Sequence, residues 1–563
     1  MTCSKPVQLF LGRSVFCGLL AVMLMPLVTG GAEFQQKGAA QEQETKKDES
    51  ASGQALLDEA FELKLTARTG QDFAKVVQRC EEAIKKGLDK ENEKFARRLM
   101  TSTLYQYVSR ICQPILKNDR PDASWRQRRA AAMPLLKKLL EVDDTFGDAL
   151  VLTARLEMFP GGDAKRSRQL LDKAIVVFKE DNEKLSEALS LRAGLEMDAK
   201  KKMADLDRAI KLDPSNTAAW QARALTQLRG GKFEQAAQDL EALLEKDSDN
   251  YLAMLALAEA MANLRKTDEA IELAGRAIKL EPEVPQAYEL RARIHVLTNA
   301  MNLALVDVNQ ALHLQPGSYS SLLLRARLFQ AQEKFDEALK DVETALKVRP
   351  KTVSALFLKS SIYETQRKFD RASATMRQVV ILQPDNEQAR LMLGMYYSMA
   401  SKVKKALIEF DLILAKNKGN TAALYWRADT RLNIGDHQGA RKDYERVLEA
   451  NPKHEATLNN LAWLLATSPE DALRDGKRAI ELALQASESS QYKKPHILST
   501  LAAAYAETGA YDKAVEWSNK AVKLGRDDIQ GQLEAELKSY QQEKPWREKK
   551  ELLESKDVPN KGT

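Results

Sequence analysis

The segment 338–350, ALKDVETALKVRP, carries the pattern on which the fold depends. Ala338, Val342 and Ala345 recur at spacings i, i+4 and i+7, which places them on one stripe of an amphipathic helix. Asp341 falls within the same stripe, where a carboxylate is unfavourable unless it has a partner. Pro350 ends the helix, because proline inside a helix removes a hydrogen bond and clashes with the preceding turn. The segment therefore predicts a helix with a buried carboxylate that needs a partner.

The same features recur at a fixed interval along the chain. Six prolines are separated by 34 residues or a multiple of 34: Pro214, Pro282, Pro316, Pro350, Pro384 and Pro452. Each repeat is numbered here from the third residue after this site, so that the proline falls at position 32. Position 8 then holds small residues, namely Ala224, Ala258, Ala292, Ala326, Ser360, Gly394, Ala428 and Ala462. Position 20 holds alanine throughout, at Ala236, Ala270, Ala304, Ala338, Ala372, Ala406 and Ala440. Small residues at both positions predict two antiparallel helices that approach each other closely in every repeat.

This pattern resembles the tetratricopeptide repeat (TPR) family. Aromatic residues match the family pattern at position 4 (Trp220), position 11 (Tyr363 and Tyr397) and position 24 (Phe410 and Tyr444). The resemblance covers roughly residues 54–528, and its last two motifs look like the C-terminal end of TPR proteins exported by bacteria. It implies an all-α fold, a TPR solenoid of antiparallel helix pairs stacked in a right-handed superhelix. It also implies that the chain binds protein or peptide segments.

The chain divides into six segments on this reading. These are a signal peptide or N-terminal membrane anchor (1–32), a disordered linker (33–53), degenerate TPR-like repeats (54–214), a regular array of 34-residue repeats (215–454), two C-terminal repeats of which the first has a lengthened turn (455–528), and a capping helix and tail (529–563).

The first segment has the layout of an export signal. Lys5 and Arg13 precede an uncharged run from Ser14 to Ala32, and Gly30 and Ala32 supply the small residues of a cleavage site. A run of 19 uncharged residues is also near the minimum for spanning a bilayer, so an uncleaved anchor is the alternative. Either reading predicts an exported protein of the periplasm or cell envelope, with no membrane contact beyond this segment.

Comparison of the repeats within the chain predicts the partner of the buried carboxylate. Where position 23 is Asp, position 7 is Arg, and where one is Leu (Leu273) so is the other (Leu257). We therefore expect structural ion pairs, partly buried between the two helices of a repeat, with guanidinium forked onto carboxylate. The predicted pairs are Arg192 with Asp205, Arg223 with Asp239, Arg291 with Asp307, Arg325 with Asp341, and Arg427 with Asp443. A catalytic role for the carboxylate is implausible, because five copies of one active site would be needed.

No motif in the sequence indicates an enzyme. The chain has no nucleophile elbow, phosphate-binding glycine loop or metalloprotease motif, and its 5 histidines lack the spacing of metal ligands. His295 occupies position 11, where the family pattern has Tyr, so we expect it in the core. We predict no catalytic residues, metal or cofactor. The 86 basic residues are interleaved with 80 acidic ones, which argues against a nucleic-acid partner.

Binding is the function that this architecture supports. In the family a concave groove is lined by first-helix positions that include 5 and 9. The candidate groove residues are Leu255, Glu259, Arg293, Leu323, Arg327, Phe357, Leu391, Met395, Tyr425, Asp429, Asn459 and Trp463. Aromatic anchors among charges suit an extended or helical protein segment. The alternative is a structural, possibly membrane-tethered, component of an envelope complex that contacts partners through its convex face or its ends.

Two cysteines remain outside the signal segment, Cys80 and Cys112. They could form a disulfide in an oxidising compartment, or they could be two small buried hydrophobic residues.

Overall fold

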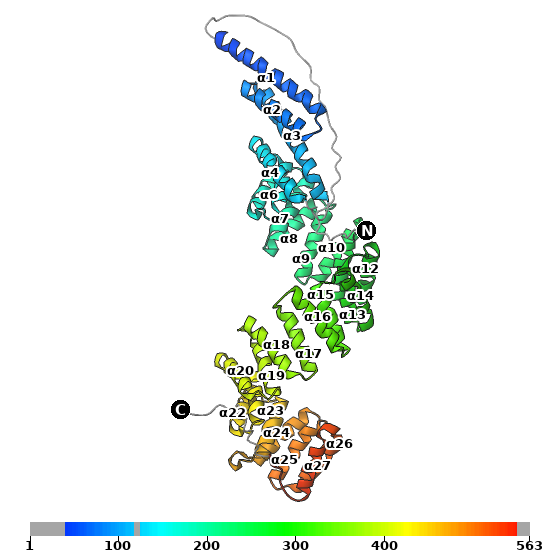
Figure 1. Ribbon diagram of the computed structural model, residues 1–563, viewed down its shortest axis with the longest axis vertical. Helices are drawn as coiled ribbons and strands as arrows, with labels where there is room; N and C mark the ends of the chain where they lie inside the picture. Colours follow the sequence, from blue (N-terminus) through cyan, green and yellow to red (C-terminus); the bar gives the residue numbers. More distant parts are fainter. Residues whose placement is uncertain (1–39, 118–123, 549–563) are drawn as a thin grey trace. The chain divides into compact units, whose positions relative to one another are not determined.

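The computed structural model describes residues 40–117 and 124–548. The regular structure of these residues is helical throughout, with twenty-seven α-helices, one short 3₁₀ helix and no strand. The predicted all-α class is therefore confirmed. None of the described helices combines the length and the apolar character that a bilayer crossing requires. The chain forms two compact units, one up to Leu314 and one from Gln315 (Figure 1).

The first unit consists of seven consecutive helix pairs in which neighbours along the chain pack against each other. The pairs are α1 (Ala40–Thr66) with α2 (Gly70–Lys86), α3 (Lys90–Lys117) with α4 (Trp125–Val142), α5 (Gly147–Glu157) with α6 (Ala164–Val177), α7 (Asn182–Leu195) with α8 (Ala199–Leu212), α9 (Thr217–Arg229) with α10 (Phe233–Lys246), α11 (Tyr251–Asn263) with α12 (Thr267–Leu280), and α13 (Pro285–Leu297) with α14 (Met301–Leu314).

The second unit consists of six further pairs and a final helix. The pairs are α15 (Tyr319–Ala331) with α16 (Phe335–Val348), α17 (Val353–Thr365) with α18 (Phe369–Leu382), α19 (Glu387–Met399) with α20 (Val403–Lys416), α21 (Thr421–Leu432) with α22 (His437–Ala450), α23 (Glu455–Thr467) with α24 (Gly476–Ser489), and α25 (Pro495–Glu507) with α26 (Tyr511–Leu524). The lengthened turn before α24 contains the 3₁₀ helix (Asp471–Leu473), and the last helix is α27 (Asp527–Gln541).

The ends of the helices are fixed by the same positions in successive repeats. The residue before each first helix is its N-cap, and Asn216, Asn250, Asn386 and Asn420 each accept a hydrogen bond from the backbone N–H three residues later. Position 15, in the turn between the two helices, has a left-handed backbone in all seven regular repeats, with φ between 55° and 80°. Glycine holds this position at Gly231 and Gly435, and larger residues hold it in the repeats between them.

The crossing of the two helices depends on the small residues at positions 8 and 20. All fifteen residues named above at these positions are buried. In the pair of α19 with α20, a Cβ placed on Gly394 would lie 2.5 Å from the ring of Phe410. The absence of a Cβ at Gly394 therefore leaves room for the ring of Phe410 at position 24.

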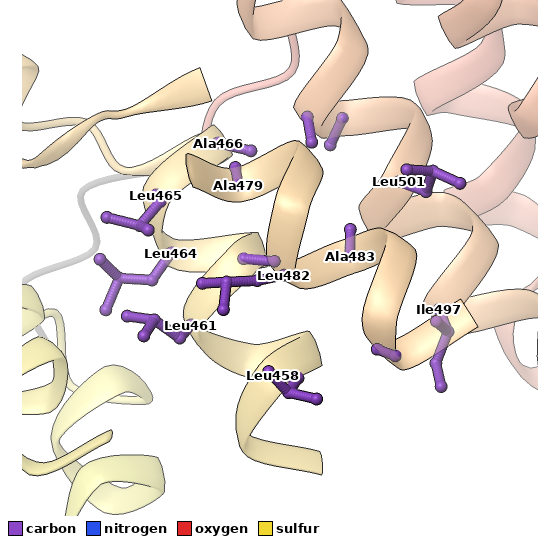
Figure 2. Close-up of a cluster of buried hydrophobic side chains, with 14 of the residues drawn as sticks. Leu458, Leu461, Leu464, Leu465, Ala466, Ala479, Leu482, Ala483, Ile497 and Leu501 are labelled. Atoms are coloured by element: carbon purple, nitrogen blue, oxygen red, sulfur yellow. The ribbon is translucent and has the colours of Figure 1, made fainter. Parts of the chain in front are cut away.

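The C-terminal pairs share one large apolar core. Leu458, Leu461 and Leu465 of α23, Leu482 of α24 and Leu501 of α25 belong to this one cluster of buried side chains (Figure 2). Helix α27 then covers the last pair, burying Leu533 and Tyr540 while its opposite side is polar and exposed. This is the arrangement expected of a capping helix at the end of a stacked array.

The N-terminal end of the described chain is helical. The predicted linker 33–53 overlaps α1, which begins at Ala40, and residues 40–53 are therefore helical rather than disordered. This stretch is rich in Ala, Glu, Gln and Lys, which are strong helix formers even without an apolar stripe. The predicted signal or anchor segment 1–32 and linker residues 33–39 lie outside the described residues.

The two cysteines are free thiols in adjacent helices. Cys80 of α2 and Cys112 of α3 are both fully buried in the same apolar cluster. Burial raises the pKa of each thiol to about 12, because the thiolate would be desolvated. Both residues therefore pack as small apolar side chains.

The structure places each of the five predicted Arg–Asp pairs in contact. Arg325 donates from Nε to Asp341 Oδ2 at 2.7 Å and from Nη2 to Oδ1 at 2.8 Å. The same two-bond fork, at 2.7–2.8 Å, joins Arg192 to Asp205, Arg223 to Asp239, Arg291 to Asp307, and Arg427 to Asp443. Each pair links the first helix of a repeat to its second helix, and the carboxylate is the more deeply buried partner.

The ion pairs are partly buried, as the sequence predicts, but their two partners lie at different depths. The side chains of Asp239, Asp307, Asp341 and Asp443 are 3–6% exposed, whereas those of their arginines are 14–26% exposed. The carboxylates lie deep because the small residues beside them let the two helices of the repeat approach closely. The side chain of Asp205 is 16% exposed and fits the expectation of partial burial.

The pair formed by Asp205 also has a different spacing from the others. Asp205 follows Arg192 by 13 residues, whereas Asp239 and Asp307 each follow their arginines by 16. The reason is that α7 ends three residues after Arg192, while α9 continues for six residues beyond Arg223. The two hydrogen bonds of the pair therefore form in the shortened repeat as well, because the missing residues are those between the arginine and the C-terminal end of the first helix.

A second set of ion pairs, which the sequence analysis missed, joins successive repeats. Arg223 Nη1 donates to Asp207 at 2.7 Å, and Arg427 Nη1 donates to Asp411 at 2.6 Å. Lys359 contacts Glu343 in the same way, at 3.0 Å. In each case the acid lies at position 25 of its repeat, in the second helix. The base lies 16 residues later, at position 7 of the next repeat. This spacing is visible in the sequence and could have predicted the contacts.

We predict that the two partners of a fork are strongly coupled. Asp341→Ala should lower the opening free energy of α15 and α16 by about 3 kcal/mol, because it removes the carboxylate onto which the partly buried Arg325 guanidinium is forked. The double substitution Arg325→Leu with Asp341→Leu should change it by less than about 1.5 kcal/mol, as the chain already has Leu257 and Leu273 at these positions. Amide hydrogen exchange of the two helices measures both values. Equal losses in the single and double variants would contradict the coupling.

Position 15 gives a second prediction. Glu333→Gly should raise stability by about 0.5–1 kcal/mol, because a left-handed backbone is strained for a residue with a Cβ. The matched reverse change, Gly435→Ala, should lower stability by a similar amount. Thermal unfolding of both variants beside the wild type tests this, and a stabilising effect of Gly435→Ala would refute it.

Candidate peptide-binding surface

The first helices of the pairs line one face of each unit. In the second unit α15 contacts α17, α19 contacts α21, α21 contacts α23, and α23 contacts α25, whereas consecutive second helices in the described chain make no contacts of that extent. First helices are therefore packed more closely than second helices, so that their face is the inner side of the stack. We call the face formed by α15, α17, α19, α21 and α23 the first-helix face.

Most of the predicted groove residues lie on the accessible side of the first helices. In the first unit Leu255 is half-buried, and Glu259 and Arg293 are exposed with 3.8 Å between their charged groups. In the second unit Arg327 is exposed, and six residues are half-buried: Phe357, Leu391, Met395, Tyr425, Asp429 and Trp463.

Two of the predicted groove residues are not accessible. Leu323 is 6% exposed and Asn459 is 9% exposed, so neither side chain offers a surface to a partner. Position 5 lies at the edge of the helix–helix contact, and at these two sites the side chain turns into the interior. The amide of Asn459 donates to Asn460 instead, at 3.1 Å.

Polar contacts connect the first helices along this face. Gln330 of α15 donates to Ser361 of α17 at 3.2 Å, and Ser398 of α19 bonds to Thr430 of α21 at 2.8 Å. Tyr396 of α19 donates to Glu364 of α17 at 2.7 Å. These contacts fix the spacing of neighbouring helices, which gives the apolar side chains between them defined positions.

An aromatic cluster lies where α21 meets α23. The ring of Tyr425 lies 5.3 Å from His454 and 6.3 Å from Tyr444. Asn460 donates to Asp429 Oδ1 at 3.3 Å and to the Tyr444 hydroxyl at 3.4 Å. Burial raises the pKa of Asp429 above its ordinary value of 3.8 and also raises the pKa of Tyr425. The cluster is thus a partly desolvated site with one acidic group.

Trp463 marks the end of this face, and the chain itself covers it. The indole Nε1–H of Trp463 donates to the carboxylate of Glu548 at 2.5 Å. The repeat pattern predicts that Trp463 lies on a first helix, as it does in α23, but gives no indication of its partner, which lies 85 residues away. No periodic pattern points to such a contact.

The raised pKa of Asp429 predicts a pH-dependent stability difference. In the folded state Asp429 keeps its proton to a higher pH than in the unfolded chain, so its contribution to stability falls as pH rises from 3.8 through the folded pKa. Asp429→Asn removes this loss and leaves an oxygen that accepts from Asn460. We expect the variant to be more stable than the wild type at pH 7.

Denaturant unfolding of both proteins at several pH values between 3 and 7 measures this difference. The advantage of the variant should shrink as pH falls towards 3.8. A difference that is constant over this range would show that the Asp429 carboxyl is not desolvated in the fold.

Comparison with known proteins identifies the repeats. Tetratricopeptide repeat models match residues 227–294, 323–370, 360–421, 422–454 and 495–528. Sperm-associated antigen 1 of Rattus norvegicus is 36% identical over 69 residues, and the Mus musculus protein is 35% identical over 69 residues. Each match covers 12% of this chain and 8% of the relative, so the chain spans less than a tenth of the length of these curated proteins.

Solved structures of low sequence identity also align with the chain. YrrB, described as a TPR protein with an unusual peptide-binding site, is 19% identical, with a TM-score of 0.31 over 34% of this chain and 98% of that one. The Cut9–Hcn1 hetero-tetramer of the APC/C is 14% identical, with a TM-score of 0.37 over 78% of this chain and 98% of that one. The family models confirm that the chain carries tetratricopeptide repeats, a fold that mediates protein–protein interactions.

Proposed function

We propose that this chain is an exported, non-enzymatic scaffold that binds an extended protein segment on the first-helix face. The observation that carries the proposal is the row of half-buried apolar side chains on successive first helices, Phe357, Leu391, Met395 and Tyr425. Side chains of this kind serve as anchors, because a partner can bury their remaining surface without reorganising the fold.

Charge on the same face supports a peptide partner. Arg327 is exposed at one end of the row and Asp429 lies at the other, so an extended segment with an acidic and a basic end would be aligned along the face. The mixture of charges over the whole chain supports a protein rather than a nucleic-acid partner. The uncharged run 14–32 supports export, with a periplasmic or envelope location.

A second candidate function rests on the opposite side of the second unit. Ile381 of α18 is 67% exposed, and Ile408 and Leu412 of α20 are 55% and 46% exposed. Large apolar side chains on the outer face of neighbouring repeats suit a structural component, tethered through residues 14–32, that contacts a complex by its convex surface.

Affinity capture with residues 33–563 as bait, from the envelope fraction of the source organism, separates the two functions. We expect Phe357→Ala with Tyr425→Ala to reduce capture of the partner at least about tenfold, because each lost anchor weakens binding by more than about 1 kcal/mol. The matched bait carries Ile408→Ser with Leu412→Ser and should capture the partner as the wild type does.

Thermal unfolding of each bait shows whether the fold is retained. A partner lost with the second bait and retained by the first would transfer the function to the convex face and refute the proposal.

A further inference from the structure

The chain returns to an earlier helix pair after its capping helix ends. Residues 545–548, Pro-Trp-Arg-Glu, follow a turn at Glu543 and lie against the C-terminal end of α23. We call these four residues the return segment. Its contacts reach residues more than 80 positions earlier, which sets it apart from the rest of the solenoid, where contacts join neighbouring repeats.

Each of the last three residues of the return segment meets a different feature of the surface. The indole of Trp546 packs on the apolar core of α23, α24 and α25, whose leucines Figure 2 shows. The guanidinium of Arg547 donates to the carbonyl of Ala466 at 3.2 Å and pairs with Glu507 of α25 at 2.5 Å. The backbone N–H of Glu548 donates to the carbonyl of Thr467 at 3.0 Å.

The Glu548 carboxylate completes the set of contacts. One oxygen accepts from Trp463 Nε1, and the other lies 3.6 Å from His437 Nε2. Carbonyls at the end of a helix carry partial negative charge and lack an intrahelical partner, so they suit both the guanidinium and the N–H of an incoming chain. The surface thus distinguishes an aromatic, a basic and an acidic residue in that order.

The surface is also held in place by groups outside the return segment. Arg474 donates from Nε to Glu507 at 3.0 Å and from Nη1 to the carbonyl of Ser468 at 2.9 Å. Arg474 lies in the lengthened turn between α23 and α24, so the turn that breaks the 34-residue period supplies the residue that positions Glu507. Both side chains are largely buried, and the contact with Arg474 fixes the position of the Glu507 carboxylate that pairs with Arg547.

From these contacts we propose that α23, α25 and the lengthened turn form a binding site for an extended peptide with the pattern aromatic–Arg–acidic, which the return segment occupies in cis. A partner that carries this pattern displaces the return segment and binds through the same groups. The inference deepens the proposed function, because it names the chemistry of a partner at one end of the first-helix face, and it rests on that function for the use of the site in trans.

Competition in cis sets the size of the expected effect. A segment on a short tether has an effective concentration on the order of millimolar, so a free peptide competes poorly while the segment is bound. Removal of the segment should therefore strengthen binding of the free peptide about tenfold or more.

The experiment uses a fluorescein-labelled peptide of sequence EKPWRE, residues 543–548 with an amidated end, in anisotropy titrations. The two proteins are the full chain and a chain that ends at Lys544. We expect the shorter chain to bind the peptide at least about tenfold more tightly. Glu507→Gln in the shorter chain should weaken binding, and a peptide with Arg547→Glu should bind to neither protein.

A second variant guards against misfolding of the shortened chain. Arg547→Glu in the full chain places a carboxylate beside Glu507 and so releases the return segment, without shortening the chain or changing any helix. This variant should also bind the wild-type peptide more tightly than the full chain does. Equal binding to the full chain and to both variants, or binding that Glu507→Gln leaves unchanged, would overturn the proposed site.

Control variants separate this inference from the proposed function. Phe357→Ala with Tyr425→Ala should leave binding of the EKPWRE peptide unchanged. If the peptide fails to bind while partner capture still depends on Phe357 and Tyr425, the site at α23 is refuted and the proposed function stands. If the peptide binds as expected while partner capture is insensitive to Phe357 and Tyr425, the site at α23 stands and binding of the partner on the first-helix face is refuted.

Discussion

The close crossing of two helices within each pair is the constraint on which the rest of the structure depends. Every pair in the regular array brings position 8 of its first helix against position 20 of its second, and both are small and fully buried. The spacing between the helices then determines what other positions can do. At 2.5 Å from the Phe410 ring, even the Cβ of an alanine in place of Gly394 could not be accommodated without displacement.

Electrostatic contacts build on this crossing. Because the helices lie close together, an arginine at position 7 reaches the aspartate at position 23 of its own repeat and, in two regular repeats, an acid of the preceding one. The guanidinium of Arg427 thus bonds to both Asp443 and Asp411. Its planar fork suits this role, since it supplies donors in two directions while its aliphatic stem packs against the helices.

Much of the fold could be predicted because the same pair of helices, with small residues at the same two positions, recurs in each repeat. The period located the helices, the small residues and the five Arg–Asp forks, which are contacts between residues 13 or 16 positions apart. The depth of the carboxylates was not predictable in the same way, since the burial of Asp239 and Asp307 depends on how closely each pair of helices packs. The helical start of α1 at Ala40 was not predicted, since its first residues lack an apolar stripe. Intrinsic helix propensity was the signal that could have found it.

The candidate site was less predictable, for a physical reason. Position in a repeat indicates which helix face a residue occupies, but it does not decide whether a side chain such as Leu323 or Asn459 turns inward, because that depends on the volumes of its neighbours. The contacts of Arg547 and Glu548 lie outside any period. The lengthened turn was visible in the sequence, yet nothing in its residues indicated that Arg474 would hold Glu507.

The return of residues 545–548 to α23 also bears on the order in which the chain acquires its structure. In a solenoid each helix pair can form once its predecessor is present, since nearly all contacts are local. The segment from α23 to α27 is different, because a closed loop of more than 80 residues must form before Glu548 meets Trp463. A chain that emerges from a ribosome or a translocation channel with its N-terminus first can therefore consolidate its early repeats in sequence. The contacts of α23 with residues 546–548 can form only after this segment has also been released.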